Sequence, residues 1–374
     1  MAIYIWGNEI DNIYIGTSPV DEVYVGTTKV RPESTPPVWD DYLCFTANVS
    51  NSSLYLYNEN VSSLVELEIS YDKNTWYDYN YYYSEYSHYY EGDIITLSNV
   101  GDKIYFRNKS TMPTLFSTSS TSCYRFGMSW SIAVSGDVNY LLCKTSTLSV
   151  GDYCFAYLFQ WCPITSAPSL PATTLGEDCY YSMFLNCTSL TTASTLPSLT
   201  LPRYCYGLMF WGCSSLIHQP TILANTIGQR SCRNMFINCT SLTTAYTIPA
   251  TTVGSEWYSN MFKWCTSLIN PPSLPATTLS GACYYSMFEN CTSLNKISAL
   301  PALTINRNDY ENMYNGCSLI CVYERNEWWQ LNPYRVPTEW TSQLSNTIYM
   351  FNNTGGTVTS IYPNQTYYTS NQVV

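Results

Sequence analysis

The sequence predicts a mainly β protein, because three different repeating patterns follow one another along its 374 residues. A phrase with a period of ten opens the chain, alternating polar and apolar residues follow, and cysteines then recur every 25 or 26 residues. We therefore expect an N-terminal β-repeat, a β-sandwich and a β-solenoid, together with a linker and a C-terminal cap. Their predicted bounds are 1–30 for the β-repeat, 31–37 for the linker, 38–145 for the sandwich, 150–320 for the solenoid and 321–374 for the cap.

The N-terminal phrase occurs at Ile3–Ile5, Ile13–Thr17 and Val23–Thr27. Alternation around glycines predicts one short strand in each copy. A segment of this length cannot bury a core of its own, so we expect it to pack on a partner and anchor the protein. The candidate anchor residues are Tyr4, Tyr14 and Tyr24. The proline-rich segment 31–37 should be a stiff linker.

Residues 38–145 are predicted to form an immunoglobulin-like or BACON-like β-sandwich. Alternation marks strands at 54–57, 65–69, 94–97 and 103–107, and Asn99–Asp102 predicts a hairpin turn between the last two. A tyrosine-rich run, residues 76–90, lies between the strands predicted at 65–69 and 94–97. It is either a hairpin with cross-strand tyrosine pairs, a subunit interface, or a face that binds glycans.

Residues 150–320 repeat a unit of about 26 residues, which is the signature of a solenoid. Phrases such as Met183–Leu190 contain an anchor cysteine, and phrases such as Leu170–Leu175 lie between anchors. We expect a strand from each anchor cysteine onward, a corner at the Thr-Thr phrase, and a short helical or 3-10 turn before the anchor. About seven coils are predicted, with anchors at Cys162, Cys187, Cys213, Cys239, Cys265, Cys291 and Cys317.

The repeated Met-Phe-x-x-Cys-Thr-Ser-Leu and Leu-Pro-Ala-Thr-Thr-Leu phrases resemble the BspA-type leucine-rich repeat. This family is common in surface proteins of gut Bacteroidetes and in their phages. The resemblance covers roughly residues 150–320 and implies a surface-recognition solenoid without shared catalytic residues. The N-terminal phrase is similar to short modules on structural proteins of Bacteroides phages, including crAss-like phages.

Of the 16 cysteines, most of those in the repeats are predicted to be buried free thiols. No Cys-x-x-Cys pair occurs, so a zinc site is not expected. A second cysteine column lies eight residues before the anchors, at Cys154, Cys179, Cys205 and Cys283. Disulfides between the two columns would leave Cys265 and Cys317 without partners, because Trp257 and Asp309 replace the second cysteine there.

The composition argues against several kinds of chemistry. Charged residues make up only 11% of the chain, against roughly 25% in an ordinary domain. The net charge of −11 argues against a nucleic-acid partner. Only His88 and His218 are present, and the acids of the repeats form no recurring pair, so we expect no catalytic residue, no metal and no cofactor. We also expect neither a signal peptide nor membrane insertion.

Exposed aromatic residues are the candidate adhesion surface. In the tyrosine-rich run they are Trp76, Tyr79, Tyr82 and Tyr86, and beside the anchor cysteines they are Trp161, Trp211 and Trp264. Trp, Asn and Gly share the position before the anchor, which indicates an exposed edge of the solenoid. Single exposed aromatics without a function are the alternative.

These patterns predict a non-enzymatic virion structural protein, a head or tail fibre, on the surface of a phage particle. Its N-terminus would bind capsid or tail proteins, and its repeats would bind a host-surface glycan or protein. A homo-oligomer, either a trimer or a dimer, would satisfy the exposed edges of the N-terminal strands. The alternative is a bacterial cell-surface adhesin of the BspA kind, and a capsule-degrading enzyme is less favoured.

Overall fold

The computed structural model describes most of the chain between residues 42 and 320 and shorter segments on either side. The described residues are 14–15, 18–19, 24–25, 28–29, 42–58, 64–83, 90–112, 119, 122–143, 148–247, 249–251, 255–298, 300–302, 306–320, 323–325, 331–336, 350, 353–354, 356–362 and 365–370. Within them the protein is mainly β, and the 3-10 turn η1 (Val138–Leu141) is the only helix. None of these segments contains a helix long and apolar enough to cross a membrane.

The chain divides into two compact units, Met1–Asp40 and Asp41–Val374. In the first unit β1 (Tyr14–Ile15) pairs with β2 (Ser18–Pro19), and β3 (Tyr24–Val25) pairs with β4 (Thr28–Lys29). Each of these two repeats is therefore an antiparallel pair of strands, and the prediction of one strand per repeat is wrong for them. A Gly-Thr dipeptide separates the paired strands in the sequence, a length that suits a tight hairpin. The first repeat and the linker 31–37 lie outside the described residues.

Residues 42–143 of the second unit form two five-stranded antiparallel sheets, which we call the two-sheet part. The first sheet has the order β14-β5-β12-β7-β8, and the second has the order β11-β6-β10-β9 with β13 also paired to β6. The strands are β5 (Leu43–Ala47), β6 (Ser52–Asn58), β7 (Leu67–Ser70), β8 (Tyr77–Tyr79), β9 (Tyr81–Tyr83), β10 (Tyr90–Gly92), β11 (Ile95–Leu97), β12 (Lys103–Asn108), β13 (Tyr124–Met128) and β14 (Ile132–Ser135).

The two sheets pack on each other through aromatic side chains. Phe45 of β5 and Phe106 of β12 lie 4.7 Å and 5.6 Å from Phe126 of β13, measured between ring centroids. Alternate residues of β6 are buried, as the sequence pattern predicts.

The predicted hairpin at Asn99–Asp102 is wrong, although the turn itself is present. The Asp102 N–H donates to the Asn99 carbonyl, and Gly101 has a φ of 87°. However, β11 pairs with β6 in one sheet, whereas β12 pairs with β5 and β7 in the other. The turn crosses between the sheets because its Gly101 N–H bonds to Ala47 at the end of β5, and not to β11.

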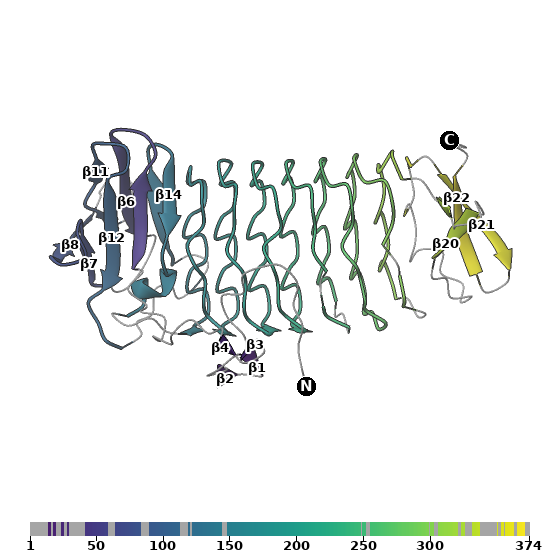
Figure 1. Ribbon diagram of the computed structural model, residues 1–374, viewed down its shortest axis with the longest axis horizontal. Coiled ribbons are helices and arrows are strands. Elements are labelled where there is room, and N and C mark those ends of the chain that lie inside the picture. The colour runs from purple at the N-terminus through teal and green to yellow at the C-terminus, as the bar shows by residue number, and fades with distance from the viewer. Residues whose placement is uncertain are drawn as a thin grey trace. The chain divides into compact units, whose positions relative to one another are not determined.

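Residues 148–320 form successive repeats that lie on one another, which we call the repeat stack; Figure 1 shows them as a row of similar turns coloured teal to green. We number repeats 1 to 7 by their anchors, from Cys162 to Cys317. Parallel pairs join neighbouring repeats, β15 (Ser149–Val150) with β16 (Thr174–Leu175), and β17 (Thr200–Leu201) with β18 (Thr226–Ile227).

The strands of the repeats are not where the sequence places them. The paired strands fall in the Thr-Leu phrase predicted to be a corner. The residues from the anchor cysteine onward begin with a turn, because the Leu190 N–H donates to the Cys187 carbonyl. Isolated parallel bridges such as His218 with Thr244 follow that turn.

The segment before each anchor is a ladder of separate turns and not one short helical or 3-10 turn as predicted; we call it the turn segment. Alternate N–H groups bond in two directions. In repeat 2 those of Tyr180 and Phe184 donate to carbonyls of repeat 3, at 3.0 Å and 2.9 Å, whereas those of Met183 and Cys187 donate three residues back. A continuous helix is excluded because only half of the N–H groups bond within the repeat.

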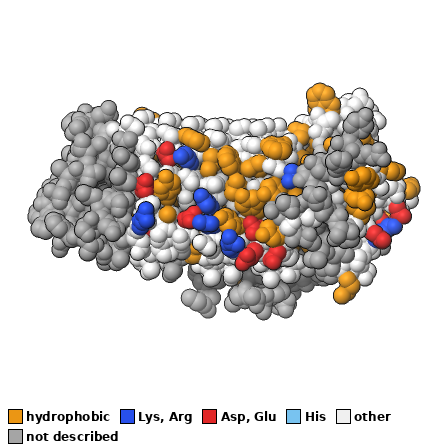
Figure 2. Space-filling model, turned by 180° about the vertical axis from the view of Figure 1, so that it is seen from behind, with side chains coloured by type: hydrophobic (Ala, Val, Ile, Leu, Met, Phe, Trp, Pro, Cys, Tyr) orange, Lys and Arg blue, Asp and Glu red, His pale blue; other side chains and the backbone are white. Residues whose placement is uncertain are grey.

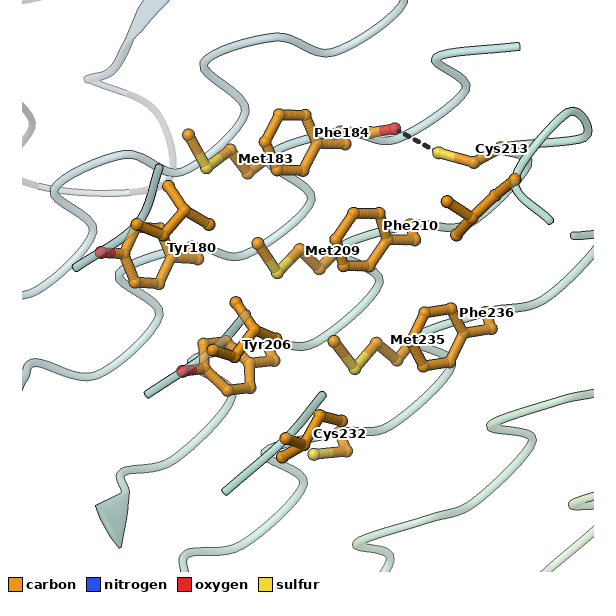
Figure 3. Packing of buried hydrophobic residues seen from close by; sticks show 14 of the residues in the cluster. Tyr180, Met183, Phe184, Tyr206, Met209, Phe210, Cys213, Cys232, Met235 and Phe236 are labelled. Atoms are coloured by element: carbon orange, nitrogen blue, oxygen red, sulfur yellow. Dashed lines mark hydrogen bonds between the residues drawn. The ribbon is translucent and has the colours of Figure 1, made fainter. Parts of the chain in front are cut away.

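Equivalent side chains of the turn segments stack in columns inside the repeats. From Phe159 to Phe288 and then Tyr314, rings of successive repeats lie 5.3–5.7 Å apart with planes within 15°. Figure 3 shows this column with the Met183, Met209 and Met235 column and the Tyr180 and Tyr206 column beside it. The burial of these columns explains the 26-residue period, since each layer must match the next.

The two-sheet part and the repeat stack share one core. Phe126 of β13 stacks on Phe159 at 5.3 Å, and its N–H donates to the Leu158 carbonyl at 2.8 Å. In an antiparallel strand, alternate backbone groups point away from the partner strand. The backbone groups of Phe126 therefore form hydrogen bonds with repeat 1 in the same way as one repeat does with the next.

The repeat pattern continues past the last anchor into the segment 321–374 that is predicted to be a cap. The Tyr314 N–H donates to the Met350 carbonyl at 2.9 Å, and Met350 is buried. Asn353 has a φ of 55° and donates through Nδ2 to Asn315 Oδ1 at 3.3 Å. The remaining described strands of the predicted cap are β19 (Tyr323–Arg325), β20 (Leu331–Val336), β21 (Gly356–Tyr362) and β22 (Gln365–Ser370).

Candidate functional site: the turn face of the repeats

The side chains of the turn segments that are not fully buried, such as Tyr181, Leu185 and Asn186 of repeat 2, form what we call the turn face. In each repeat the backbone takes a positive φ nine, five and one residues before the anchor, as at Asp178, Ser182 and Asn186 with values of 53°, 54° and 57°. Left-handed residues cost about 1–2 kcal/mol each unless they are Gly, Asn or Asp. The hydrogen bonds between repeats offset this cost and hold the turn face rigid.

The position before the anchor explains the mixture of Trp, Asn and Gly noted in the sequence. All seven of its residues have φ values between 57° and 78°, and five of them are Asn or Gly, which suit this conformation. Trp161 and Trp264 are the exceptions, and they are 63% and 40% exposed. Two large aromatic residues are therefore held on the surface in a conformation that disfavours them, which is common at functional sites.

Three tyrosines of repeats 1, 2 and 3 form a row on the turn face. Tyr157 and Tyr181 pack edge to face at 5.6 Å, and Tyr181 and Tyr204 do so at 6.0 Å. Burial raises the pKa of Tyr157 to about 12 and also raises that of Tyr181. Their hydroxyl groups therefore stay protonated near neutral pH and are able to donate hydrogen bonds.

Aromatic residues of the second sheet extend this row. The guanidinium of Arg125 in β13 lies 4.9 Å from the ring centroid of Tyr157. Arg125 is opposite Tyr57 in β6, and the rings of Tyr57 and Tyr55 are 5.8 Å apart. The tyrosine row thus begins beside β6 and ends at Tyr204.

Arginines surround the far end of the tyrosine row. Arg230 donates from Nη1 to the Tyr204 hydroxyl at 2.8 Å, and the guanidinium of Arg203 lies 5.0 Å from the Tyr204 ring centroid. Glu256 accepts from both Arg230 and Arg233. Arg203 is less well paired, because its nitrogen is 4.0 Å from Glu177 and its side chain is 48% exposed. Figure 2 shows a face with this composition, where hydrophobic side chains lie among adjacent basic and acidic ones.

Asp178 lies buried below this cluster. Burial raises the pKa of its carboxyl group, and Arg203 opposes this shift while Glu177 adds to it. The Asp178 carboxyl also interacts with Tyr153. This carboxyl group is therefore a second acidic neighbour of Arg203 besides Glu177.

The predicted adhesion residues of the tyrosine-rich run do not share one surface. Tyr82 is 61% exposed, but Tyr79 is only 4% exposed, so its assignment to an adhesion surface is wrong. The Tyr79 hydroxyl donates to the Asp93 carbonyl and accepts from the Leu56 N–H, which ties it into the core. Trp76 is half-buried, with Arg107 3.8 Å from its ring centroid, and Tyr86 lies outside the described residues.

The hairpin interpretation of the same run is confirmed for its described part. β9 and β10 are antiparallel, and Tyr83 lies directly opposite Tyr90 with ring centroids 5.3 Å apart. Among the predicted anchor residues, Tyr14 and Tyr24 lie in β1 and β3, and Tyr4 is outside the described residues. The structure does not describe their side chains.

The predicted burial of the repeat cysteines is confirmed, and all 15 cysteines that the structure describes are buried. From repeat 2 onward each anchor thiol donates a hydrogen bond to the carbonyl of the phenylalanine one repeat earlier, as Cys213 does to Phe184 at 3.1 Å (Figure 3). The Cys162 thiol donates to Phe126 of β13 in the same way. The seven Sγ to oxygen distances are 2.9–3.1 Å. The anchor position thus needs a residue that is small, apolar and a donor.

No group of three or more His, Cys, Asp or Glu side chains in the described segments is arranged to hold a metal ion. The chain matches no protein-family model, no curated protein and no solved structure.

Sequence reasoning placed Trp161, Trp211 and Trp264 beside the anchors but missed the tyrosine row and Arg203. Trp161 and Trp264 are exposed, and Trp211 is half-buried in repeat 3. Tyr181 and Tyr204 occupy different positions of their repeats, so a search for equivalent residues does not connect them. Their packing became visible only from the lateral contacts between repeats.

Proposed function

We propose that the protein is a non-enzymatic binding protein of a phage particle, a head or tail fibre whose repeats adhere to host-surface glycans. In this proposal the repeat stack is a leucine-rich-repeat solenoid of the BspA type, and the two-sheet part is an immunoglobulin-like sandwich. The N-terminal β-repeat would anchor the protein to capsid or tail proteins and form the contacts of a homo-oligomer.

The rigid row of Tyr157, Tyr181 and Tyr204 is the observation that carries the adhesion role. Tyrosine and tryptophan rings offer flat apolar surface with a polar edge, which suits the faces and hydroxyl groups of sugars. The row lies on hydrogen-bonded turns, so little conformational entropy is lost when a ligand binds. Trp161, 63% exposed, adds an aromatic ring to the same face in repeat 1.

The virion assignment is supported by the phrases that resemble phage modules and BspA repeats, and it is tested on particles. Mass spectrometry of purified virions should detect this chain at a copy number typical of a structural protein. Its absence from virions, together with its presence on bacterial cells, would favour the cell-surface adhesin instead.

Adhesion is tested separately with the full chain on an array of bacterial surface polysaccharides. We expect selective binding that the substitution Tyr181→Ala weakens. Tyr285→Ala is the matched control, because Tyr285 occupies the same position in repeat 6, away from the tyrosine row. Absence of binding to every glycan, or equal loss in both variants, would contradict the proposed role of this face.

A further inference from the structure

The spacing of the turn face matches that of an extended sugar chain. Stacked rings of successive repeats are separated by 5.3–5.7 Å, so outward side chains recur at nearly the same interval. One hexopyranose unit advances an extended β-linked polysaccharide by a similar length. A chain lying along the stack would therefore place one sugar over each repeat.

The aromatic positions follow that direction. Tyr157, Tyr181 and Tyr204 belong to repeats 1, 2 and 3, and Arg230 of repeat 4 bonds to the last of them. A ligand that crossed the stack would meet one or two of these residues. A ligand parallel to the stack meets all four.

One arginine at the end of this path is available to an anionic ligand. Arg230 and Arg233 both use Glu256 as their partner. Arg203, between Tyr181 and Arg230 in the order of the repeats, forms one ion pair among the described residues, the 4.0 Å contact with Glu177, and its guanidinium also lies over the Tyr204 ring. Nearly half of its side chain is exposed. Its guanidinium is thus able to form the two-pronged hydrogen bond that carboxylates favour.

We infer that the ligand of the turn face is an extended acidic polysaccharide that runs along repeats 1 to 4, with one uronate carboxylate bound by Arg203. This inference rests on the proposed adhesion function and names its ligand class. The carboxylate displaces the exposed Glu177 side chain from Arg203, and the sugar rings contact the tyrosine row.

The test is calorimetric titration of the full chain with β-linked oligouronates of increasing length and with neutral β-glucans of equal length. Affinity for the oligouronates should rise until the oligomer spans repeats 1 to 4 and then level off. The substitution Arg203→Gln should weaken oligouronate binding by about tenfold, the loss typical of one charge-assisted hydrogen-bond pair. Arg307→Gln is the matched control, because Arg307 has the same position in repeat 7 and its carbonyl accepts the equivalent backbone hydrogen bond.

The outcomes separate the inference from the function on which it rests. If neutral glucans bind as tightly as oligouronates, or if Arg203→Gln and Arg307→Gln have equal effects, the acidic ligand is wrong and the adhesion proposal stands. If affinity does not depend on length, the parallel path is wrong. If neither class binds and the polysaccharide array is also negative, the proposed function fails as well. Thermal unfolding of each variant confirms that it is folded.

Discussion

The side-chain oxygen of Asn186 occupies the space that a Cβ atom on Gly212 would need, one repeat further along. The two residues share the position before the anchor cysteine, and both have a positive φ. Asn290 and Gly316 repeat the same relationship in repeats 6 and 7. A Cβ on Gly212 or Gly316 would therefore collide with the asparagine oxygen one repeat earlier unless that side chain moved.

This relationship predicts that Gly212→Ala lowers the free energy of unfolding by about 2–4 kcal/mol, combining backbone strain and overpacking. Adding Asn186→Gly should restore part of the loss, because it removes the colliding oxygen. Gly101→Ala is the control, since Gly101 has a φ of 87° but nothing within 4 Å of its would-be Cβ, so it reports strain alone. Chemical denaturation measures each value, and equal costs at both glycines would contradict the collision.

The anchor hydrogen bond predicts that serine is less destabilising than alanine at an anchor cysteine, and that the order is reversed at a buried cysteine without this bond. Cys239 donates to the Phe210 carbonyl at 3.1 Å, so Cys239→Ser keeps a donor while Cys239→Ala should cost about 1–2 kcal/mol. Cys232 replaces a tyrosine in its column, and its thiol forms no hydrogen bond among the described residues. There serine should cost more than alanine, because the new hydroxyl is buried without a partner. If serine and alanine rank in the same order of stability at both sites, the anchor hydrogen bond does not contribute to stability.

Alkaline pH should destabilise the repeat stack. Burial raises the pKa of Cys232 and Cys317 to about 12, above the value of about 8.5 expected in the unfolded chain. The folded state therefore retains protons that the unfolded chain has released. Stability is fully present below the unfolded pKa and is lost as the pH rises through this window toward the folded pKa. Denaturation midpoints at neutral pH and near pH 10 should differ in this direction, and a midpoint that rises with pH would contradict the burial of the thiols.

The shared core predicts that the two-sheet part and the repeat stack unfold together. Phe126→Ala removes a ring that contacts Phe45 and Phe159, and should cost about 3–5 kcal/mol. Calorimetry of the wild-type chain should show a single unfolding transition for residues 42–320. In the variant this single transition should move to a lower temperature. Two separate transitions in the wild type would show instead that the parts are independent.

The 26-residue period and the buried columns could be predicted from the sequence, because stacked layers require identical residues at identical positions. The conformation of the turn segments could not, since their hydrogen bonds follow neither the helical nor the strand period. Asn and Gly before the anchor cysteine were the available signal for the positive φ there. Met350 and Asn353 also match the Met-Phe-x-Asn phrase, but Met350 lies 37 residues after Met313, outside the regular period.

The contacts that form the candidate site depend on lateral packing. Arg125 and Tyr157 are 32 residues apart and belong to different predicted parts, so no local pattern connects them. Tyr79 was wrongly predicted to be exposed, because a tyrosine-rich run gives no indication of which ring lies in the core. Alternation alone assigns faces to a strand but does not identify the face that another sheet covers.

The most direct test of the central claim, that the turn face binds glycans, compares Trp161→Asn with Trp264→Asn. Asparagine suits the positive φ at both sites, so the free energy of unfolding should stay unchanged or rise by up to about 1 kcal/mol. Affinity for the polysaccharide that the array identifies should fall about tenfold in Trp161→Asn, because an exposed ring of repeat 1, the repeat that also carries Tyr157, is lost. It should change little in Trp264→Asn. Wild-type affinity in a fully folded Trp161→Asn protein would contradict the account.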